Sequence, residues 1–399
     1  MYTKEDVLSY VAEEEIKLIR LAFCDIFGKE KNITILPEQL NRAFSGGICF
    51  DASAIRGFGN CVKSDLFLVP DPATLSILPW HPVHSKVIRM FCDIRYPDGR
   101  QFERDCRYLL KKAVAQAKEL GLTCNIGAEF EFYLFQSGDG GEPTKIPYDH
   151  AGYMDIYPED RGETVRREIC FSLLEMGIAP EASHHEEGPS QHEIDFKYSD
   201  ALTAADNATT FKAVVKAIAM RNGLTADFSP KPLAGESGNG LHINISVLSD
   251  DGQDRSSCFM AGILQHIREL SVFLNPTTES YQRLGEKKAP RYVTWSHENR
   301  SQLIRIPAAT GAYQRIEVRS PDPTCNPYLA FALLLHAGMD GVRQNLMPDA
   351  PTDQNLFTAD KKLTAGLKTL PATYDEAYQL AQSSSFVKSL VPEGFVQMY

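Results

Sequence analysis

Two glutamates, Glu186 and Glu193, flank a short turn signal that could bring both carboxylates into one space. On one straight strand their odd separation of seven positions would put them on opposite faces. However, Gly188-Pro189-Ser190 lies between them and is typical of a turn. A strand that folds back there can aim both side chains into the same cavity. The alternative is a charged surface hairpin, because most carboxylates in proteins are solvated.

Three further segments carry polar side chains at alternate positions of strand-like sequence. Their polar faces comprise Glu129 and Glu131 in residues 128–134, His242, Asn244 and Ser246 in residues 241–247, and Arg315, Glu317 and Arg319 in residues 315–319. This period of two predicts strands with one polar face. A sheet with one solvated face is the alternative. Such a face would favour Thr, Lys and Ser, whereas Glu, His and Arg together indicate a shared polar cavity.

Together these segments supply a set of carboxylates with a single imidazole. The set consists of Glu129, Glu131, Glu186, Glu193, Glu317 and His242. Without counter-charge the packed carboxylates would repel one another and take up protons, which divalent cations would prevent. Because oxygen ligands dominate, we expect Mg²⁺ or Mn²⁺ rather than Zn²⁺. Several such ions in one cavity suit phosphoryl transfer, in which they neutralise phosphate oxygens.

Basic side chains and a glycine-rich run fit the same chemistry. The arginines are Arg283, Arg300, Arg305, Arg315 and Arg319. Their planar guanidinium groups could hold phosphates and substrate carboxylates. Residues 235–240 (GESGNG) would allow a ligand to approach the backbone closely, although an ordinary loop is the alternative. No Walker A motif is present.

The whole-chain composition is that of a globular protein acting on small molecules. The chain has 399 residues, a formal charge of −11, and 43% hydrophobic and 23% charged residues. The acidic balance argues against nucleic acid as a partner. Nine cysteines without a Cys-x-x-Cys pair suggest reduced thiols. With no signal-peptide core and no membrane-length apolar run, we expect a cytoplasmic location and no membrane partner.

The elements that must position these residues divide into two regions. Strand signals lie at 16–25, 31–36, 65–69, 74–78 and 87–95, and helical spacing lies at about 104–120, 162–176, 203–221, 259–273 and 326–345. A capping box at Thr373 to Glu376 begins a later helix. We therefore predict an α+β protein. A small, mostly β N-terminal domain spans 1–101, and a larger domain spans 102–399 with a curved antiparallel sheet backed by helices.

The sequence resembles a type I glutamine synthetase over nearly its whole length. The motifs that carry the resemblance are residues 50–55, 129–132, 184–196, 238–242, 275–277, 299–301, 304–307 and 315–323. The resemblance implies a β-grasp-like N-terminal domain and a glutamine synthetase-type catalytic domain. It also implies a two-step ligation, in which ATP phosphorylates the side-chain carboxylate of glutamate and an amine then displaces phosphate.

The resemblance implies metal and catalytic roles. Glu131, Glu186 and Glu193 would hold one Mg²⁺ or Mn²⁺, and Glu129, His242 and Glu317 would hold the ion that bridges the nucleotide phosphates, giving two to three ions per site. Arg300 would assist the phosphoryl transfer. Asp51 would come from a neighbouring subunit of a homo-oligomeric ring and would act beside Glu186.

The resemblance also implies substrate-binding roles. Arg283, Arg319, Ser237 and Gly238 would bind glutamate. Ser53 and Tyr153 would take the incoming ammonium with Asp51. Tyr198, Asn244, Ser246, Arg305 and Arg315 would lie along the nucleotide.

Three departures from the family pattern bear on these roles. Ser237 stands where the family has Asn. The segment 283–290 is one residue shorter than usual, and Lys288 falls where the family carries the Glu that closes the ammonium site. The sequence stops at Tyr399, where the family continues with a helical tail that ties two hexameric rings together. We therefore expect a single hexamer or a looser double ring.

Two functional interpretations follow. The first is a working ligase that makes glutamine, or a γ-glutamyl amide of another amine. The second is a catalytically weak paralogue with a regulatory role. The intact set of acidic and basic residues favours the ligase.

Overall fold

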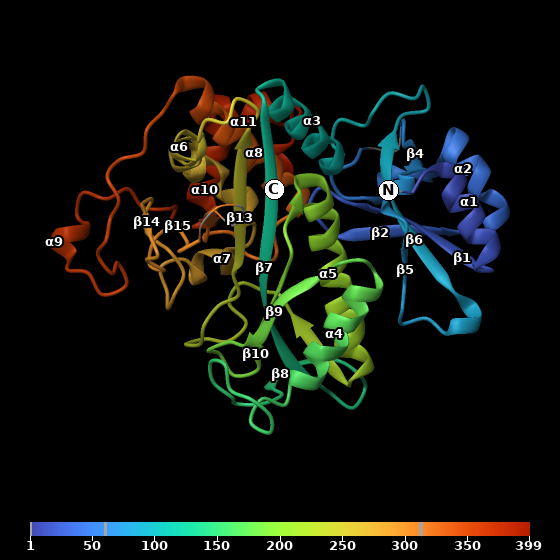
Figure 1. The fold of residues 1–399 in the computed structure, drawn as a ribbon, viewed down its shortest axis with the longest axis horizontal. Coiled ribbons are helices and arrows are strands. Elements are labelled where there is room, and N and C mark those ends of the chain that lie inside the picture. Colours follow the sequence, from blue (N-terminus) through green and yellow to red (C-terminus); the bar gives the residue numbers. More distant parts are fainter. Residues whose placement is uncertain (1, 60–61, 310, 312–313) are drawn as a thin grey trace.

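The N-terminal region forms one sheet with two short helices beside it (Figure 1). The computed structural model describes residues 2–59, 62–309, 311 and 314–399. In this region the strands are β1 (Leu18–Cys24), β2 (Glu30–Ile35), β3 (Ile48–Asp51), β4 (Asp65–Pro70), β5 (Ser76–Ile77) and β6 (Val87–Arg95), and the helices are α1 (Lys4–Glu13) and α2 (Leu40–Gly46). The strand order is β2-β1-β6-β4-β3, with β5 also paired to β6. The central pair, β1 and β6, is parallel.

The prediction of a continuous strand over 74–78 was wrong. A 3-10 turn covers Pro72–Thr74, and only Ser76–Ile77 pairs as a strand. Asp71 begins the turn, because its side chain accepts a hydrogen bond from the Ala73 amide. Pro72 then supplies the fixed φ that suits the first position of such a turn.

The larger region is built on a second sheet, which contains ten strands in the described part of the chain. They are β7 (Leu122–Ser137), β8 (Pro143–Pro147), β9 (Pro180–His185), β10 (Gln191–Phe196), β11 (Ser199–Asp200), β12 (Leu224–Asp227), β13 (Leu241–Ser249), β14 (Trp295–His297), β15 (Ile304–Ile306) and β16 (Ile316–Val318). The order is β14-β15-β16-β13-β7-β10-β9, and β8, β11 and β12 also pair with the long strand β7. Nearly all pairings are antiparallel, as predicted; β14 and β15 are the parallel exception.

The described part of the larger region also contains α-helices, several of which pack on the apolar side of this sheet. They are α3 (Cys106–Glu119), α4 (Glu163–Glu175), α5 (Ala201–Arg221), α6 (Ser256–Leu274), α7 (Thr278–Arg283), α8 (Pro327–Gln344), α9 (Lys361–Thr364), α10 (Tyr374–Ser383) and α11 (Ser385–Leu390). Thr373 caps α10 as predicted, and Asn326 caps α8 ahead of Pro327. The architecture is therefore the predicted α+β arrangement.

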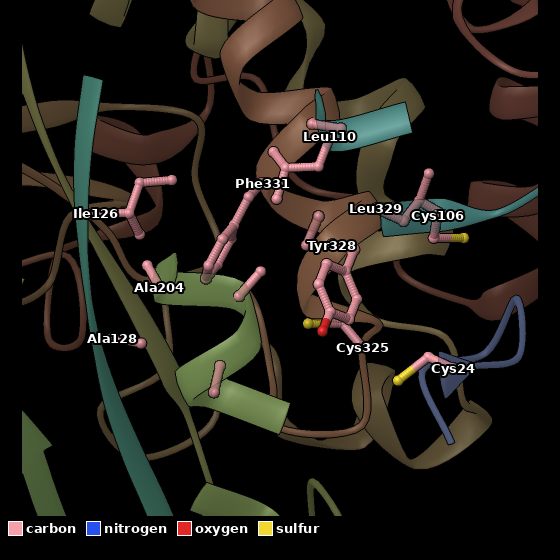
Figure 2. Packing of buried hydrophobic residues seen from close by; sticks show 14 of the residues in the cluster. Cys24, Cys106, Leu110, Ile126, Ala128, Ala204, Cys325, Tyr328, Leu329 and Phe331 are labelled. Atoms are coloured by element: carbon pink, nitrogen blue, oxygen red, sulfur yellow. The ribbon is translucent and has the colours of Figure 1, made fainter. Parts of the chain in front are cut away.

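The core explains why one face of β7 is apolar. Phe130 and Phe132 are fully buried, and both rings lie beside Phe211 of α5. Figure 2 shows α8 between α3, α5 and β7, with Tyr328 and Phe331 pointing into the shared core. Because alternate residues of a strand point to opposite sides, this packing turns Glu129 and Glu131 to the other face.

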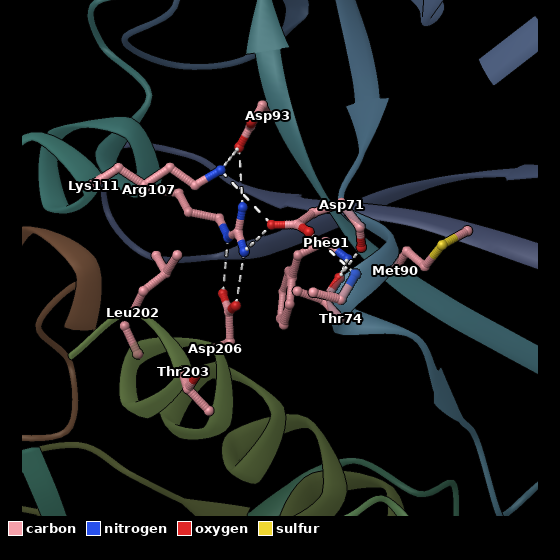
Figure 3. A network of polar contacts seen from close by, with 12 residues as sticks. Asp71, Thr74, Met90, Phe91, Asp93, Arg107, Lys111, Leu202, Thr203 and Asp206 are labelled. Atoms are coloured by element: carbon pink, nitrogen blue, oxygen red, sulfur yellow. Dashed lines mark hydrogen bonds and ion pairs between the residues drawn. The ribbon is translucent and has the colours of Figure 1, made fainter. Parts of the chain in front are cut away.

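A polar network joins the two regions. Arg107 of α3 donates hydrogen bonds to Asp206 of α5 (3.0 and 2.9 Å), Asp93 of β6 (3.0 Å) and Asp71 (2.9 Å). Lys111 lies 2.6 Å from Asp93 (Figure 3). These contacts fix the N-terminal sheet against the helices of the larger region.

In the described residues, no helix is long and apolar enough to cross a membrane, and the eight cysteines described are free.

Candidate active site

The stretch around Glu186 and Glu193 folds back as predicted and brings both carboxylates together. Strands β9 and β10 pair antiparallel across a turn in which Ser190 has a positive φ of 58°. His184 lies 3.8 Å from Glu186 and 3.2 Å from Glu193 through its two ring nitrogens. The two carboxylates are only 15% and 12% exposed. The alternative of a solvated surface hairpin is therefore wrong.

The register of β7 and its neighbours aligns the remaining acidic residues. Glu131 is paired with Glu193 of β10, and Glu129 is paired with His242 of β13. The next strand, β16, carries Glu317, which is fully buried and lies 3.8 Å from His242. All four segments singled out by their polar faces thus meet on one side of a single sheet.

Of the two predicted sets of metal ligands, one has its ligand atoms close together and the other is divided. The ligand atoms of Glu129, His242 and Glu317 lie within 4.8 Å of one another, as expected for one ion. The other predicted set is divided: Glu131 and Glu193 group with His242, while Glu186 and Glu193 group with His184. Glu193 therefore links two neighbouring groups of ligand atoms.

Burial and mutual repulsion perturb these acids. Burial raises the pKa of Glu193, and the charges of Glu131 and Glu129 raise it further. Burial, and then the charge of Glu193, also raise the pKa of Glu186. Glu129 behaves differently: burial acts to raise its pKa, but the hydrogen bond and charge of His242 hold it at about 2. We call Glu129, Glu131, Glu186, Glu193 and Asp195 the acidic wall. Its histidines, His184 and His242, offset only part of its negative charge.

Sequence reasoning missed Asp195, although a signal was present. It follows Glu193 by two positions on β10 and so lies on the same face, opposite Glu129 in the register. Burial raises its pKa well above the usual range, and the charge of Glu193 adds to this. Among the described residues, its buried Oδ1 has no hydrogen-bond partner. A buried carboxylate oxygen without a partner is costly, and a bound cation would satisfy it.

Arginines line the same cavity as the acidic residues, as predicted. Arg305 and Arg319 donate to the two oxygens of Glu317 at 2.6 and 3.0 Å. Arg315 donates to Asn244 Oδ1 at 2.8 Å. Arg300 also lines this cavity, which has a volume of about 460 Å³.

The remaining predicted ligand-binding residues divide between two adjoining spaces. Tyr153, Ser237, Gly238 and Arg283 line the 460 Å³ cavity, together with the acidic wall. Tyr198, Asn244 and Ser246 line a second cavity of about 160 Å³. Glu129, Asp195 and Arg315 line both, so the predicted nucleotide residues lie next to the predicted metal ligands.

The glycine-rich loop approaches the acidic wall closely. The Gly240 amide donates to Glu131 at 2.6 Å, and Gln191 donates to the Gly238 carbonyl at 3.1 Å. A Cβ at Gly238 would lie 2.3 Å from the Pro230 carbonyl oxygen, so only glycine fits there. The Ser237 carbonyl accepts from Tyr133 at 2.6 Å. These contacts hold the loop against the cavity through its backbone.

Asp51 and Ser53 do not join the site of their own chain. Both lie at the end of β3 in the N-terminal sheet, where Asp51 accepts hydrogen bonds from the Ser53 amide (2.9 Å) and hydroxyl (2.7 Å). Neither residue lines the two cavities, and Asp51 is exposed.

Lys288 lies at the edge of the cavity. Its Nζ is 2.6 Å from Glu187 and 5.4 Å from the centre of the Tyr153 ring. Lys287 and Glu286 of the same segment also line the cavity. The shortened segment 283–290 thus covers the side of the site that contains Tyr153 and Glu186.

Comparisons with known proteins agree with this geometry. The sequence matches two family models, "Glutamine synthetase, beta-Grasp domain" over residues 15–97 and "Glutamine synthetase, catalytic domain" over residues 103–399. A glutamine synthetase of Clostridium saccharobutylicum is 46% identical over 402 residues, covering 97% of this chain and 91% of the relative. One of Methanosarcina mazei is 45% identical over 413 residues, covering 100% and 92%.

Solved structures of similar fold also match the chain over nearly its whole length. A structure described as a GmaS/ADP complex matches with a TM-score of 0.89 at 28% identity, covering 98% of this chain and 93% of that one. A Plasmodium falciparum glutamine synthetase structure matches with a TM-score of 0.87 at 23% identity, covering 100% and 94%. The latter shows likeness of fold.

Proposed function

Because the chain belongs to the glutamine synthetase family, we propose that it is an ATP-dependent ligase that joins ammonia to the γ-carboxylate of glutamate. The observation that carries this proposal is that acidic and basic side chains line one cavity together. Glutamates of β7 and β10 and the histidine of β13 share it with Arg305 of β15 and with Arg315 and Arg319 beside β16, the next strands of the same sheet. Cations held by the acidic residues, together with these guanidinium groups, would neutralise phosphate oxygens.

The donor set fits Mg²⁺ or Mn²⁺. Oxygen ligands dominate, the pKa of Glu186 and that of Glu193 are raised, chiefly by burial, and Asp195 has an unpartnered buried oxygen. Glu129, His242 and Glu317 would hold one ion, and Glu131, Glu186 and Glu193 would hold another, with Asp195 nearby. When bound, these ions polarise phosphoryl oxygens and offset their charge.

The arginines and the glycine-rich loop would position the two substrates. Arg283 and Arg319 would bind the carboxylates of glutamate, with the Gly238 backbone and Ser237 beside them. Arg315, with Tyr198, Asn244 and Ser246, would hold the nucleotide in the adjoining cavity, and Arg305 would hold its phosphates from the main cavity. Arg300 would then neutralise charge on the γ-phosphate as it moves from ATP to the glutamate oxygen.

The amine would attack the acyl phosphate carbon, and phosphate would leave. Tyr153 and Glu186 would face the incoming ammonium cation from within the chain. Asp51 and Ser53 would complete this subsite from a neighbouring subunit, because they lie outside the cavities of their own chain and Asp51 is exposed. We therefore propose a homo-oligomeric ring with shared sites.

Mixing two inactive variants tests the shared site. Asp51→Asn and Glu129→Ala would each be inactive alone. After dissociation and reassociation, a mixed oligomer should regain part of the activity, since some sites combine an intact Asp51 with an intact Glu129. An active monomer in sedimentation, or no recovery in verified mixed oligomers, would contradict the proposal.

Lys288 supports a second candidate, a γ-glutamyl amide synthetase that accepts another amine. Its ammonium group lies over the Tyr153 ring, where an incoming cation would lie, and its ion pair with Glu187 is partly exposed, so it compensates the charge only in part. Charge repulsion from Lys288 would weaken ammonium binding, and the shorter segment leaves room for an alkyl group. Lys288→Glu should therefore lower the KM for ammonium relative to methylamine, whereas Lys118→Glu, an equal charge reversal on the exposed face of α3, is the matched control. Tight ammonium binding that Lys288→Glu leaves unchanged would exclude this candidate.

ADP release tests the proposed function itself. With Mg²⁺ or Mn²⁺ present, ADP should form only when glutamate and an amine are both supplied. A panel of amines in the same assay identifies the preferred nucleophile. ADP release that does not depend on glutamate would contradict the proposed ligase activity. Absence of ADP release with every amine would also contradict it and would favour a regulatory paralogue.

A further inference from the structure

A separate cleft of about 810 Å³ lies between the N-terminal sheet and the larger region. The turn between β1 and β2 forms one wall, and β8, β12 and one face of α5 form the others. None of its lining residues lines the two cavities described above. It is therefore distinct from the proposed ligase site.

Four lysines line this cleft, and one of them, Lys145, is paired with Asp227. The other three converge on the cleft from two directions. Lys29 comes from the β1–β2 turn, while Lys212 and Lys216 are one turn apart on α5. Residues four apart on a helix are neighbours on its surface, so the last two bring like charges together. Lys212 Nζ donates to the carbonyls of Pro323 (3.2 Å) and Cys325 (3.5 Å). An ammonium group has three N–H donors, so one remains.

The other two lysines lack anionic partners. Among the described residues, no carboxylate lies within ion-pair distance of Lys29 or Lys216, and Lys216 lies 5.8 Å from the centre of the Phe228 ring. Burial lowers the pKa of Lys216, and the charges of Lys212 and Lys29 lower it further. This cationic cluster is thus electrostatically unfavourable in the absence of an anion.

The two carboxylates of the cleft compensate the lysines only in part. Asp227 forms an ion pair with Lys145 and accepts a hydrogen bond from the Ser229 amide at 2.7 Å, and its charge is the smallest of the causes acting on the pKa of Lys216. Burial raises the pKa of Glu30, and the charges of Arg89, Arg20 and Lys212 oppose that effect. Because lysines outnumber carboxylates along its walls, the cleft keeps an excess of positive charge.

We propose that this cleft binds a small anion bearing a phosphate group, held between Lys29 on one side and Lys212 and Lys216 on the other. Lysine binds phosphate as a compact point charge and does not need the planar bidentate geometry of arginine. A phosphate group also offers oxygens in several directions, which suits donors from two separate elements. Because Lys29 belongs to the N-terminal region, the bound anion would bridge both parts of the molecule.

Titration calorimetry of the full-length protein with inorganic pyrophosphate tests the site. EDTA removes divalent ions, so the measurement does not depend on the ligase reaction. We expect saturable binding that Lys29→Gln and Lys216→Gln each weaken about tenfold, through the loss of one charged contact. Lys118→Gln, on the exposed face of α3, and Arg305→Ala, in the proposed ligase site, should leave this binding unchanged.

Two outcomes would overturn the proposal. One is no saturable binding, or an unchanged Kd in the folded Lys29→Gln/Lys216→Gln double variant, with folding checked by circular dichroism. The other is an equal affinity for succinate, which would show that any dianion suffices and that phosphate is not selected. Weaker binding of succinate by tenfold or more supports the assignment.

Discussion

Two clusters of carboxylates in this molecule differ in whether the chain itself neutralises their charge. At the boundary between the two regions, three aspartates surround Arg107, whose side chain is 4% exposed and lies within 3.0 Å of each (Figure 3). In the cavity, Glu186 and Glu193 have only His184 as an ion-pair partner among the described residues. The first cluster is neutralised by the chain itself, so it serves structure. The second is left for cations that the chain does not supply.

The largest expected effect comes from removing a proposed metal ligand. Glu129→Ala should lower turnover by about a thousandfold or more, because several kcal/mol of charge stabilisation are lost and each 1.36 kcal/mol is tenfold in rate. Steady-state ADP release with saturating substrates measures this. Circular dichroism should show an intact fold, and turnover near the wild-type rate would contradict the proposed role of Glu129.

Arg107→Met tests the opposite cluster. It leaves three buried or half-buried aspartates without their shared cation, so the free energy of unfolding should fall by about 3–5 kcal/mol. Urea denaturation measures the change. The matched control is Arg100→Met, which breaks the exposed pair with Asp98 and should have almost no effect. Equal stability of the two variants would remove the distinction between the clusters.

In contrast to Arg107→Met, Glu193→Gln should stabilise the folded protein when no metal is bound. Burial and the neighbouring Glu131 and Glu129 raise the pKa of Glu193, so its charged form is unfavourable in the folded protein. The melting temperature in EDTA should therefore rise slightly. In Mg²⁺ the variant should lose part of the stabilisation that the wild type gains, because a ligand is missing. A lower melting temperature in EDTA would show that Glu193 is already compensated.

The smallest effect is a dependence of stability on pH. The pKa values of Glu186, Glu193 and Asp195 are raised on folding, so their contribution is fully present below the unfolded pKa and is lost as pH rises through the folded pKa. Bound Mg²⁺ offsets this loss by favouring the charged carboxylates. Thermal melts should show a larger stabilisation by Mg²⁺ at pH 8 than at pH 6. Equal shifts at both values would contradict the assignment.

Much of the site was predictable because strand periodicity sets which side chains share a face. The apolar residues of β7 and β13 fix the register against the helices, and this register brings Glu129 and His242 together. The turn after Gly188 likewise places Glu186 beside Glu193. Family resemblance then supplied roles that periodicity alone could not.

Other features depend on contacts that no local pattern encodes. The Arg107 network joins residues 36 and 99 positions apart in the sequence, and the lysine cleft joins a turn to a distant helix. Asp195 has the spacing that places it on the face of Glu193, but spacing alone does not show that it is buried, because burial depends on how β10 packs. Asp51 and Ser53 lie outside their own cavity, so their predicted role concerns a second subunit and stays a prediction.

The central claim is that the acidic wall is left uncompensated because it holds divalent cations. Titration of metal-free protein with Mn²⁺, followed by electron paramagnetic resonance, tests this most directly. We predict at least two bound ions per chain, with one fewer in Glu129→Ala and in Glu193→Ala, and an unchanged number in the lysine variant Lys216→Gln. Absence of bound Mn²⁺ in the wild type, or an unchanged number in both glutamate variants, would contradict the account.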